Sequence, residues 1–333
     1  MELWVDVIIL CFLVATALAV ALSHDLFAST MLTGIYSLLS ATFFVLMDAV
    51  DVAFTEASVG AGISTVLMLS TLTLIGQRET LSRHNILVGL TVVLATGALL
   101  IVGTQDMPAF GDPSTPVQQH LAPHFINQSA SEIGIPNIVT AILASYRGFD
   151  TFGETVVIFT AGIGVLSLLS YAPSQSNSSR PATMHQHKIL RVVSKVLIPP
   201  IMLFALYVQF HGDYGPGGGF QAGVIFAAAL ILYAMLFGLN TAQKVINLGV
   251  VRLLSAVGVL IYGSVGLISL LQGKNFLDYS ALAHDPQHGQ HYGILLVELG
   301  VGITVAAVML IVFFSFAERV GKIARGTGPE TGS

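Results

Sequence analysis

The sequence predicts an all-α, polytopic integral membrane protein with about nine transmembrane helices. Hydrophobic residues make up 54% of the 333 residues, whereas charged residues make up only 9%. A soluble globular domain carries about 25% charged residues, so this chain has too few charges to cover a surface exposed to water. The mean hydropathy of +0.82 also excludes an intrinsically disordered chain.

Nine stretches of mostly apolar residues reach the roughly 20 residues that a helix needs to cross a bilayer. In chain order they are residues 3–22, 26–46, 52–75, 86–102, 152–171, 189–210, 220–239, 248–271 and 292–316. Many of them are apolar around the whole helix, as expected where one face meets lipid.

The distribution of Lys and Arg indicates the orientation, because these residues concentrate in cytoplasmic loops. With the N-terminus outside and the C-terminus inside, only Arg147 and Lys274 of the 13 Lys and Arg residues fall on the outer side. This asymmetry independently supports an odd number of spans. No basic residue precedes the first span, so we expect that span to be retained rather than cleaved as a signal peptide.

The chain divides into two dissimilar halves. Residues 1–104 form a predicted four-helix membrane domain, and residues 105–172 form an external segment followed by the fifth span. A short helix is expected within this segment, near residues 137–146. Residues 173–188 are polar and Ser-rich with two prolines, which predicts a cytoplasmic linker. Residues 189–333 form a second four-helix domain.

Three glutamates lie within or at the start of predicted spans: Glu56, Glu154 and Glu298. An ionisable side chain inside a bilayer costs several kcal/mol unless it faces a wet or paired interior. We therefore interpret these carboxylates as candidates that carry protons or cations between packed helices. In the structural alternative, Glu56 marks the end of its span, Glu154 belongs to a structural ion pair, and Glu298 caps a subunit contact.

Two aspartates and an arginine accompany these glutamates. Asp51 precedes Glu56, and Asp150 precedes Glu154, so both aspartates join the predicted ion or proton pathway. Arg147 is close enough in sequence to pair with Asp150 or with Glu154. Small residues at helical spacing allow another helix to approach closely, and the predicted contact glycines are Gly60, Gly62, Gly300 and Gly302.

Residues 211–223 read HGDYGPGGGFQAG and cannot continue a helix. They predict a tight extracellular turn or a re-entrant break between the sixth and seventh spans, with His211 and Asp213 lining it. An ordinary hairpin loop is the alternative. The residues expected to form the tight turn are Gly215, Pro216, Gly217, Gly218 and Gly219.

The sequence favours neither a metal site nor a cofactor. Three histidines precede the last span: His284, His288 and His291. Pro286 and Gly289 are predicted to break any helix that would align them, so we expect no metal site there. The single cysteine, Cys11, excludes an intramolecular disulfide and a four-cysteine cluster. A net charge of −5 gives no basic face for nucleic acid.

Four motifs resemble parts of one known family, the Mrp-type (Mnh) multisubunit cation/proton antiporters. Residues 51–72 (DVAFTEASVGAGISTVLMLSTL) and 139–166 (VTAILASYRGFDTFGETVVIFTAGIGVL) are similar to the C-terminal domain of the large A-type polypeptide. That domain has counterparts in membrane-bound hydrogenases and respiratory complex I. Residues 211–223 and 292–309 (YGILLVELGVGITVAAVM) resemble the B-type polypeptide (MrpB/MnhB). The family often has His where Asp213 stands and Ser where Gly215 stands.

The resemblance implies a fusion of an A-type tail with a B-type subunit in a prokaryotic plasma membrane. The antiporter-like core, with its intramembrane lysines, is absent from this sequence, so the implied partners are a truncated A-type core and the C, D, E, F and G-type subunits. The implied function is that of a secondary transporter subunit, not an enzyme, which exchanges Na⁺ or another monovalent cation for H⁺ in a lipid bilayer. Two alternatives stay open: the ion-translocating arm of a hydrogenase or complex-I-like oxidoreductase, and a purely structural subunit.

The charge asymmetry predicts that reporters fused at Ser178 and at Ser333 both report the cytoplasm. A fluorescent protein that matures only inside the cell and a phosphatase active only outside it measure this. A matched fusion after Gly273 should give the opposite result. An external signal at Ser178 would contradict the predicted number of spans in the first half.

Overall fold

The computed structural model describes residues 2–75, 78–79, 83–109, 111–169 and 188–326. In that part of the chain it contains helices and no β-strand. Nine candidate spans are long and apolar enough to cross a membrane, which confirms the predicted fold class. The predicted linker at residues 173–188 lies, apart from Lys188, outside the described residues.

The first four spans contain six helical elements. In order they are α1 (Glu2–Leu22), α2 (Leu26–Leu46), α3 (Val50–Glu56), the π-helix η1 (Ala57–Ser64), α4 (Thr65–Ile75) and α5 (Arg83–Thr104). The helices α3, η1 and α4 together form the third span. A π-helix inside a span is unusual, and π-turns occur frequently at functional sites.

The external segment is more helical than the sequence predicted. It contains η2 (Val117–Leu121), α6 (Ala122–Glu132), α7 (Ile138–Thr140) and η3 (Ala141–Tyr146). The short helix expected near residues 137–146 is therefore present as α7 and η3. It begins at Asn137, whose side chain accepts hydrogen bonds from the backbone N–H groups of Val139 and Thr140, as an N-cap residue does.

The remaining helices complete the bundle. They are α8 (Gly148–Leu169), α9 (Lys188–His211), α10 (Gly219–Phe237), α11 (Leu239–Val245), α12 (Leu248–Leu271), the 3₁₀-helix η4 (Tyr279–Leu282) and α13 (Pro286–Gly326). Pro286 is the first residue of α13, where its missing N–H costs nothing. The prediction that Pro286 and Gly289 break a helix was therefore wrong, and His288 and His291 lie on the first turns of α13.

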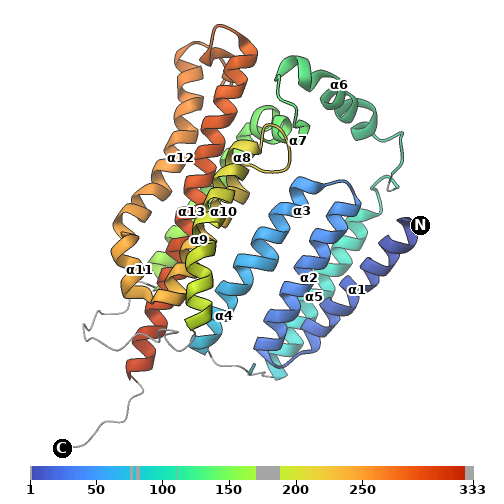
Figure 1. The fold of residues 1–333 in the computed structure, drawn as a ribbon. Helices are drawn as coiled ribbons and strands as arrows, with labels where there is room; N and C mark the ends of the chain where they lie inside the picture. Colours follow the sequence, from blue (N-terminus) through green and yellow to red (C-terminus); the bar gives the residue numbers. More distant parts are fainter. Residues whose placement is uncertain (1, 76–77, 80–82, 110, 170–187, 327–333) are drawn as a thin grey trace, which may run out of the picture.

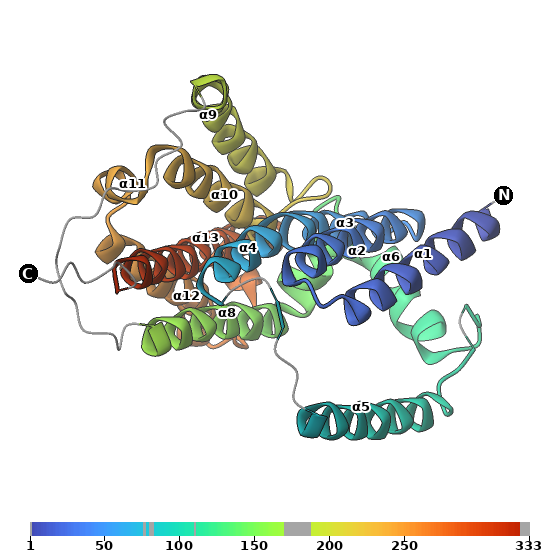
Figure 2. The same cartoon turned by 90° about the horizontal axis from the view of Figure 1, so that it is seen from below.

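Helix α13 forms the centre of the bundle. Figures 1 and 2 show it surrounded by α8, α10 and α12, with α4 also alongside. Most of the apolar residues of its span are buried, whereas none of those in α5 are. Figure 2 shows α5 standing apart from the other spans, so α5 presents an apolar surface around its whole circumference.

Close contacts between backbones fix α13 against two neighbours. An ideal Cβ on Gly258 of α12 would lie 2.5 Å from the Gly300 carbonyl oxygen, and one on Gly300 would lie 2.7 Å from the Gly258 carbonyl oxygen. On α10, a Cβ on Gly223 would lie 2.6 Å from the Gly302 carbonyl oxygen. Small residues allow membrane helices to approach in this way. A Cβ on Gly62, by contrast, would meet only the carbonyl oxygen of Ala57 on its own span, at 3.5 Å.

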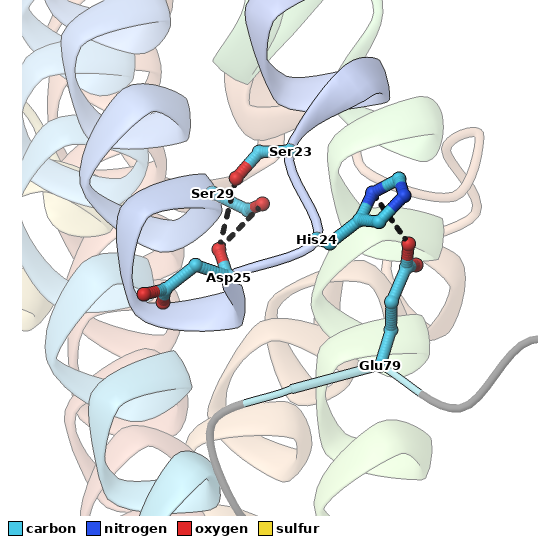
Figure 3. A network of polar contacts seen from close by, with 5 residues as sticks. All are labelled: Ser23, His24, Asp25, Ser29 and Glu79. Carbon is cyan, nitrogen blue, oxygen red and sulfur yellow. Dashed lines mark hydrogen bonds and ion pairs between the residues drawn. The ribbon is translucent and has the colours of Figure 1, made fainter.

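A polar network joins the α1–α2 turn to the segment that follows α4 (Figure 3). The hydroxyls of Ser23 and Ser29 donate to the Asp25 carbonyl oxygen at 3.1 and 3.0 Å. The Nδ1 atom of His24 lies 3.1 Å from the Glu79 carboxylate, and the Glu79 N–H donates to the His24 carbonyl oxygen. These contacts hold the α1–α2 turn next to the segment that follows the third span, on the side predicted to be cytoplasmic.

The Gly258–Gly300 contact predicts that Gly258→Ala destabilises the bundle. Inserting a methyl group into a well-packed interior typically costs about 1–3 kcal/mol, so the midpoint of thermal unfolding in mild detergent should fall. Gly97→Ala on α5 is the matched control, because nothing lies within 4 Å of a Cβ at that position. Equal unfolding midpoints for the two variants would contradict the close α12–α13 contact.

Candidate functional site

A cavity of 360 Å³ lies where α3, η3, α8, α10 and α13 meet. Three carboxylates from three different spans line it: Asp51, Glu154 and Glu298. The side chains of Thr55, Thr151 and Gln221, the hydroxyl-bearing Tyr262 and the backbone of Gly217 to Gly219 are also part of the wall. The structure therefore brings together carboxylates from both halves of the chain.

Asp51 is held by the Gly-rich turn and by α10. Its Oδ1 atom accepts a hydrogen bond from the backbone N–H of Gly217 at 3.2 Å. The Gln221 side-chain amide donates to the Thr55 hydroxyl at 2.9 Å and to the Asp51 carbonyl oxygen at 3.5 Å. These contacts join the start of the third span, in the first half, to the second half.

Glu298 lies three turns into α13, directly beneath the same turn. A Cβ on Gly212 would lie 2.9 Å from its Oε2 atom, and a Cβ on Gly218 would lie 3.0 Å from its Oε1 atom. Gly218 has a φ of +126°, which favours glycine at that position. Among the described residues, none donates a hydrogen bond to the Glu298 carboxylate, so its oxygens are free to accept a proton or a cation.

Glu154 and Asp150 separate in the structure. Glu154 lines the cavity from α8, and Tyr262 lines it from α12. Arg147 pairs with Asp150 instead, with 2.5 Å between Nη2 and Oδ2. Both partners of that pair are exposed, and neither lines the cavity. Because Arg147 pairs with Asp150, no basic side chain among the described residues pairs with the Glu154 carboxylate.

Glu56 faces away from the cavity. Its Oε1 atom accepts a hydrogen bond from the Ser37 hydroxyl on α2, and a Cβ on Gly60 would collide with both side chains. Glu56 is the last residue before the π-helix η1. The structure thus places Glu56 at the α2–α3 contact, five residues from Asp51 and on a different face of the span.

The Gly-rich segment forms a tight turn that hydrogen bonds from Asn137 and Thr140 hold in place. The Asn137 side-chain amide donates to the carbonyl oxygens of Gly212 and Gly215 at 3.0 and 2.9 Å. The Thr140 hydroxyl donates to the Gly212 carbonyl oxygen at 2.7 Å. A Cβ on Gly217 would lie 2.7 Å from the Val208 carbonyl oxygen. Few side chains fit inside this turn, which explains its glycine content.

His211 and Asp213 have different surroundings within the turn. The ring of His211 stacks on Tyr207, with 4.8 Å between the ring centroids. Asp213 is buried and lies 2.8 Å from Nδ1 of His291. Burial raises the pKa of the Asp213 carboxyl above its ordinary value, and the facing His291 opposes that rise.

Sequence reasoning did not assign several residues that the structure places at this site: Thr55, Asn137, Gln221 and His291. The sequence contained a signal that could have identified two of these residues. Gln221 belongs to the Gly-rich motif, and His291 is seven residues before Glu298 on the same helical face. Within the described residues, no group of three or more His, Cys, Asp or Glu side chains is arranged to hold a metal ion.

Family models match three consecutive parts of the chain. A domain related to the MnhB subunit of the Na⁺/H⁺ antiporter matches residues 189–311, and MBH subunits D and E match residues 11–77 and 90–186. The putative antiporter subunit mnhB2 of Staphylococcus haemolyticus is 32% identical over 132 residues, which are 39% of this chain and 93% of that subunit. The chain belongs to the Mrp-type (Mnh) family of antiporter subunits. The predicted resemblance is therefore confirmed.

A longer relative of this Mnh-type chain extends over both halves. It is the probable K⁺/H⁺ antiporter A/B subunit of Rhizobium meliloti, which is 25% identical in an alignment 327 residues long that covers 90% of this chain. The chain spans 32% of the length of that relative. Its likeness to an A/B fusion agrees with the predicted A-type and B-type halves.

Two solved structures resemble this Mnh-type fold. The Mrp complex from Dietzia sp. DQ12-45-1b contains a chain with a TM-score of 0.73 at 24% identity, and the match covers 93% of this chain and 34% of that chain. The archaeal membrane-bound sulfane sulfur reductase gives a TM-score of 0.51 at 27% identity, with 68% of this chain and 95% of that chain covered. The first likeness supports the fold only.

The clamp on the Gly-rich turn predicts that Asn137→Ala destabilises the turn. The change removes the two side-chain hydrogen bonds of Asn137, so the Gly215 carbonyl oxygen loses its donor while Thr140 still donates to Gly212. Leaving a buried polar group unsatisfied costs about 1–3 kcal/mol. Hydrogen exchange of residues 212–218 in the assembled protein should become faster. The matched control is Asn127→Ala on the exposed face of α6, and equal exchange in both variants would contradict a structural role for Asn137.

Proposed function

We propose that this chain is a membrane subunit of a multisubunit monovalent cation/proton antiporter, and that Asp51, Glu154 and Glu298 form part of its ion or proton pathway. The observation that carries the proposal is the shared cavity between α3, α8, α10 and α13, which three carboxylates line. Three acidic groups around one cavity within a bilayer are costly unless ions or protons reach them.

The chemistry of the lining suits exchange. A carboxylate binds a hard cation through oxygen, and it carries a proton when its surroundings disfavour the charged form. Glu298 accepts no hydrogen bond from the described residues, so a cation or a proton would be its main counterpart. Asp51 differs because Gly217 donates to it. Competition between Na⁺ or K⁺ and H⁺ for the same oxygens couples the two ions without covalent catalysis.

The named relatives support the same role. An A/B-type polypeptide of a K⁺/H⁺ antiporter and mnhB2 antiporter subunits are similar to this chain. We infer that the chain works with other antiporter subunits in a prokaryotic plasma membrane, as part of a transporter and not as an enzyme. In this arrangement the N-terminus is outside, and residues 1–172 and 189–333 correspond to the A-type tail and the B-type polypeptide.

A second function has support of its own. Matches to MBH subunits D and E, and the fold likeness to the sulfane sulfur reductase, favour an ion-translocating arm of a redox-driven membrane complex. The same cavity would then move ions in response to electron transfer in another subunit. Identification of the chains that co-purify in mild detergent separates the two functions, because redox subunits would accompany the chain only in the second.

The cavity predicts that Glu298→Gln abolishes exchange while the complex still assembles. Gln keeps the shape and hydrogen-bonding capacity of Glu but removes its charge and its proton. Cation-dependent dequenching of a pH-sensitive dye in membrane vesicles measures exchange, and a native gel measures assembly. Glu154→Gln should also reduce exchange, since that carboxylate lines the same cavity.

The comparison with Glu56 gives this experiment a second use. Glu56→Gln tests the α2–α3 contact, because Glu56 accepts from Ser37 and does not line the cavity. Asp106→Asn, which changes an exposed acid after α5 that does not line the cavity, is the neutral control. The proposed site is contradicted if assembled Glu298→Gln and Glu154→Gln complexes exchange ions like wild type while Glu56→Gln abolishes exchange. That result would assign the pathway to the α2–α3 contact.

A further inference from the structure

A titratable pair lies above the cavity, between the α9–α10 turn and the first turns of α13. The Oδ2 atom of Asp213 is 2.8 Å from Nδ1 of His291. The Asp213 side chain is 9% exposed, whereas that of His291 is 39% exposed. One partner is therefore accessible from the surface of the bundle, and the other points into it.

The pair lies on a short path to the cavity. His291 precedes Glu298 by seven residues, about two turns along the same face of α13. The segment from Gly212 to Gly218 connects the His291–Asp213 pair to Glu298, and Gly212 and Gly218 both lie against the Glu298 carboxylate. Asp213 belongs to this segment and directly follows Gly212.

The position of Asp213 is fixed from a third side. The backbone N–H of Asn137 donates to the Asp213 carbonyl oxygen at 3.0 Å, and Asn137 and Thr140 hold the neighbouring Gly212 carbonyl oxygen. The backbone at Asp213 is therefore held in place without depending on the ion pair alone.

We propose, on the basis of the proposed function, that His291 and Asp213 form the proton entry of the carboxylate cavity. His291 begins neutral, with its proton on Nδ1, and takes up a second proton at Nε2 from the outer solution. The imidazolium then gives its Nδ1 proton to the Asp213 carboxylate, which leaves the ring neutral with its proton on Nε2. Asp213 passes its proton to Glu298 and returns to the carboxylate form. The ring returns to the Nδ1–H tautomer by exchanging protons with the outer solution, so no charge accumulates on the pair.

The chemistry of both groups suits this transfer. Histidine changes its charge near neutral pH, so it can load and release protons under physiological conditions. Burial raises the pKa of Asp213, which brings a carboxyl closer to the range in which it can accept a proton from an imidazolium. A fully exposed aspartate would be too weak a base for this step.

Other charged groups near the pair already have partners or belong to the cavity. Just before α13, Asp285 pairs with His288 at 3.3 Å. Beyond these two, the packed elements carry His211 on α9, Asp51 on α3, Glu298 on α13, Glu132 on α6, and the pair of Arg147 before α8 with Asp150 in its first turn. His291 is the charged group that acts most strongly on Asp213.

The alternative is an ion pair that only holds the turn on α13. The discriminating variant is His291→Arg in the complete complex, because Arg keeps a cation beside Asp213 but cannot release its proton. If the pair carries protons, we expect exchange to fall by about a hundredfold, the low end of what a positioned proton carrier contributes. The pH dependence between neutral and mildly acidic conditions should also flatten, while a native gel shows normal assembly.

Two further variants complete the test. The double exchange Asp213→His with His291→Asp puts the same two groups back in reversed positions, and it should restore exchange to within about tenfold of wild type. His288→Arg is the matched control, because His288 lies one turn away on α13 and faces the exposed Asp285. It should leave both the rate and the pH profile unchanged.

Each outcome has one meaning. Wild-type exchange with an unchanged pH profile in assembled His291→Arg complexes would overturn the proton entry. If that variant does not assemble, His291→Gln decides by the same criterion, since Gln still donates a hydrogen bond to Asp213 but carries no titratable proton. If Glu298→Gln also exchanges like wild type, the proposed cavity fails as well, so the two failures are distinguishable.

Discussion

The contact between Gly219 and the backbone of Glu298 is the constraint on which the site depends. A Cβ on Gly219 would collide with the Glu298 carbonyl oxygen, so α10 can begin this close to α13 only with glycine. This contact holds the preceding turn over the Glu298 carboxylate and brings Gly217 within hydrogen-bonding distance of Asp51. One close approach of two backbones thereby assembles groups from three spans.

The cost of charge in a bilayer gives that assembly its functional meaning. A charged carboxylate among lipid tails costs free energy, and the contacts that offset this cost differ from one acid to the next. Asp51 receives a backbone N–H, Glu56 receives the Ser37 hydroxyl, and Asp213 faces His291. Glu298 receives no such donor from the described residues, although it lies at the centre of the bundle. Under the proposed function, a cation or a proton would complete the surroundings of this carboxylate.

The spans were predictable from the sequence because bilayer thickness fixes their length and their apolar composition. The sequence did not predict in the same way which carboxylates meet at the cavity. Glu56 was predicted to belong to the pathway, but its carboxylate accepts from Ser37 on α2, and the neighbouring Gly60 faces the same contact and not the cavity. Pro286 was interpreted as a helix breaker, whereas it begins α13. That error placed His284, His288 and His291 in a loop, so His291 was not assigned to the site.

The most direct test of the account is a double-mutant cycle between Asp51 and Glu298, with cation-induced current measured on a solid-supported membrane. These residues lie 247 positions apart in the sequence, one in each half of the chain. If they share one cavity, the effects of Asp51→Asn and Glu298→Gln should be non-additive by at least about 0.5 kcal/mol in apparent cation affinity. Additive effects in assembled complexes would contradict the shared site.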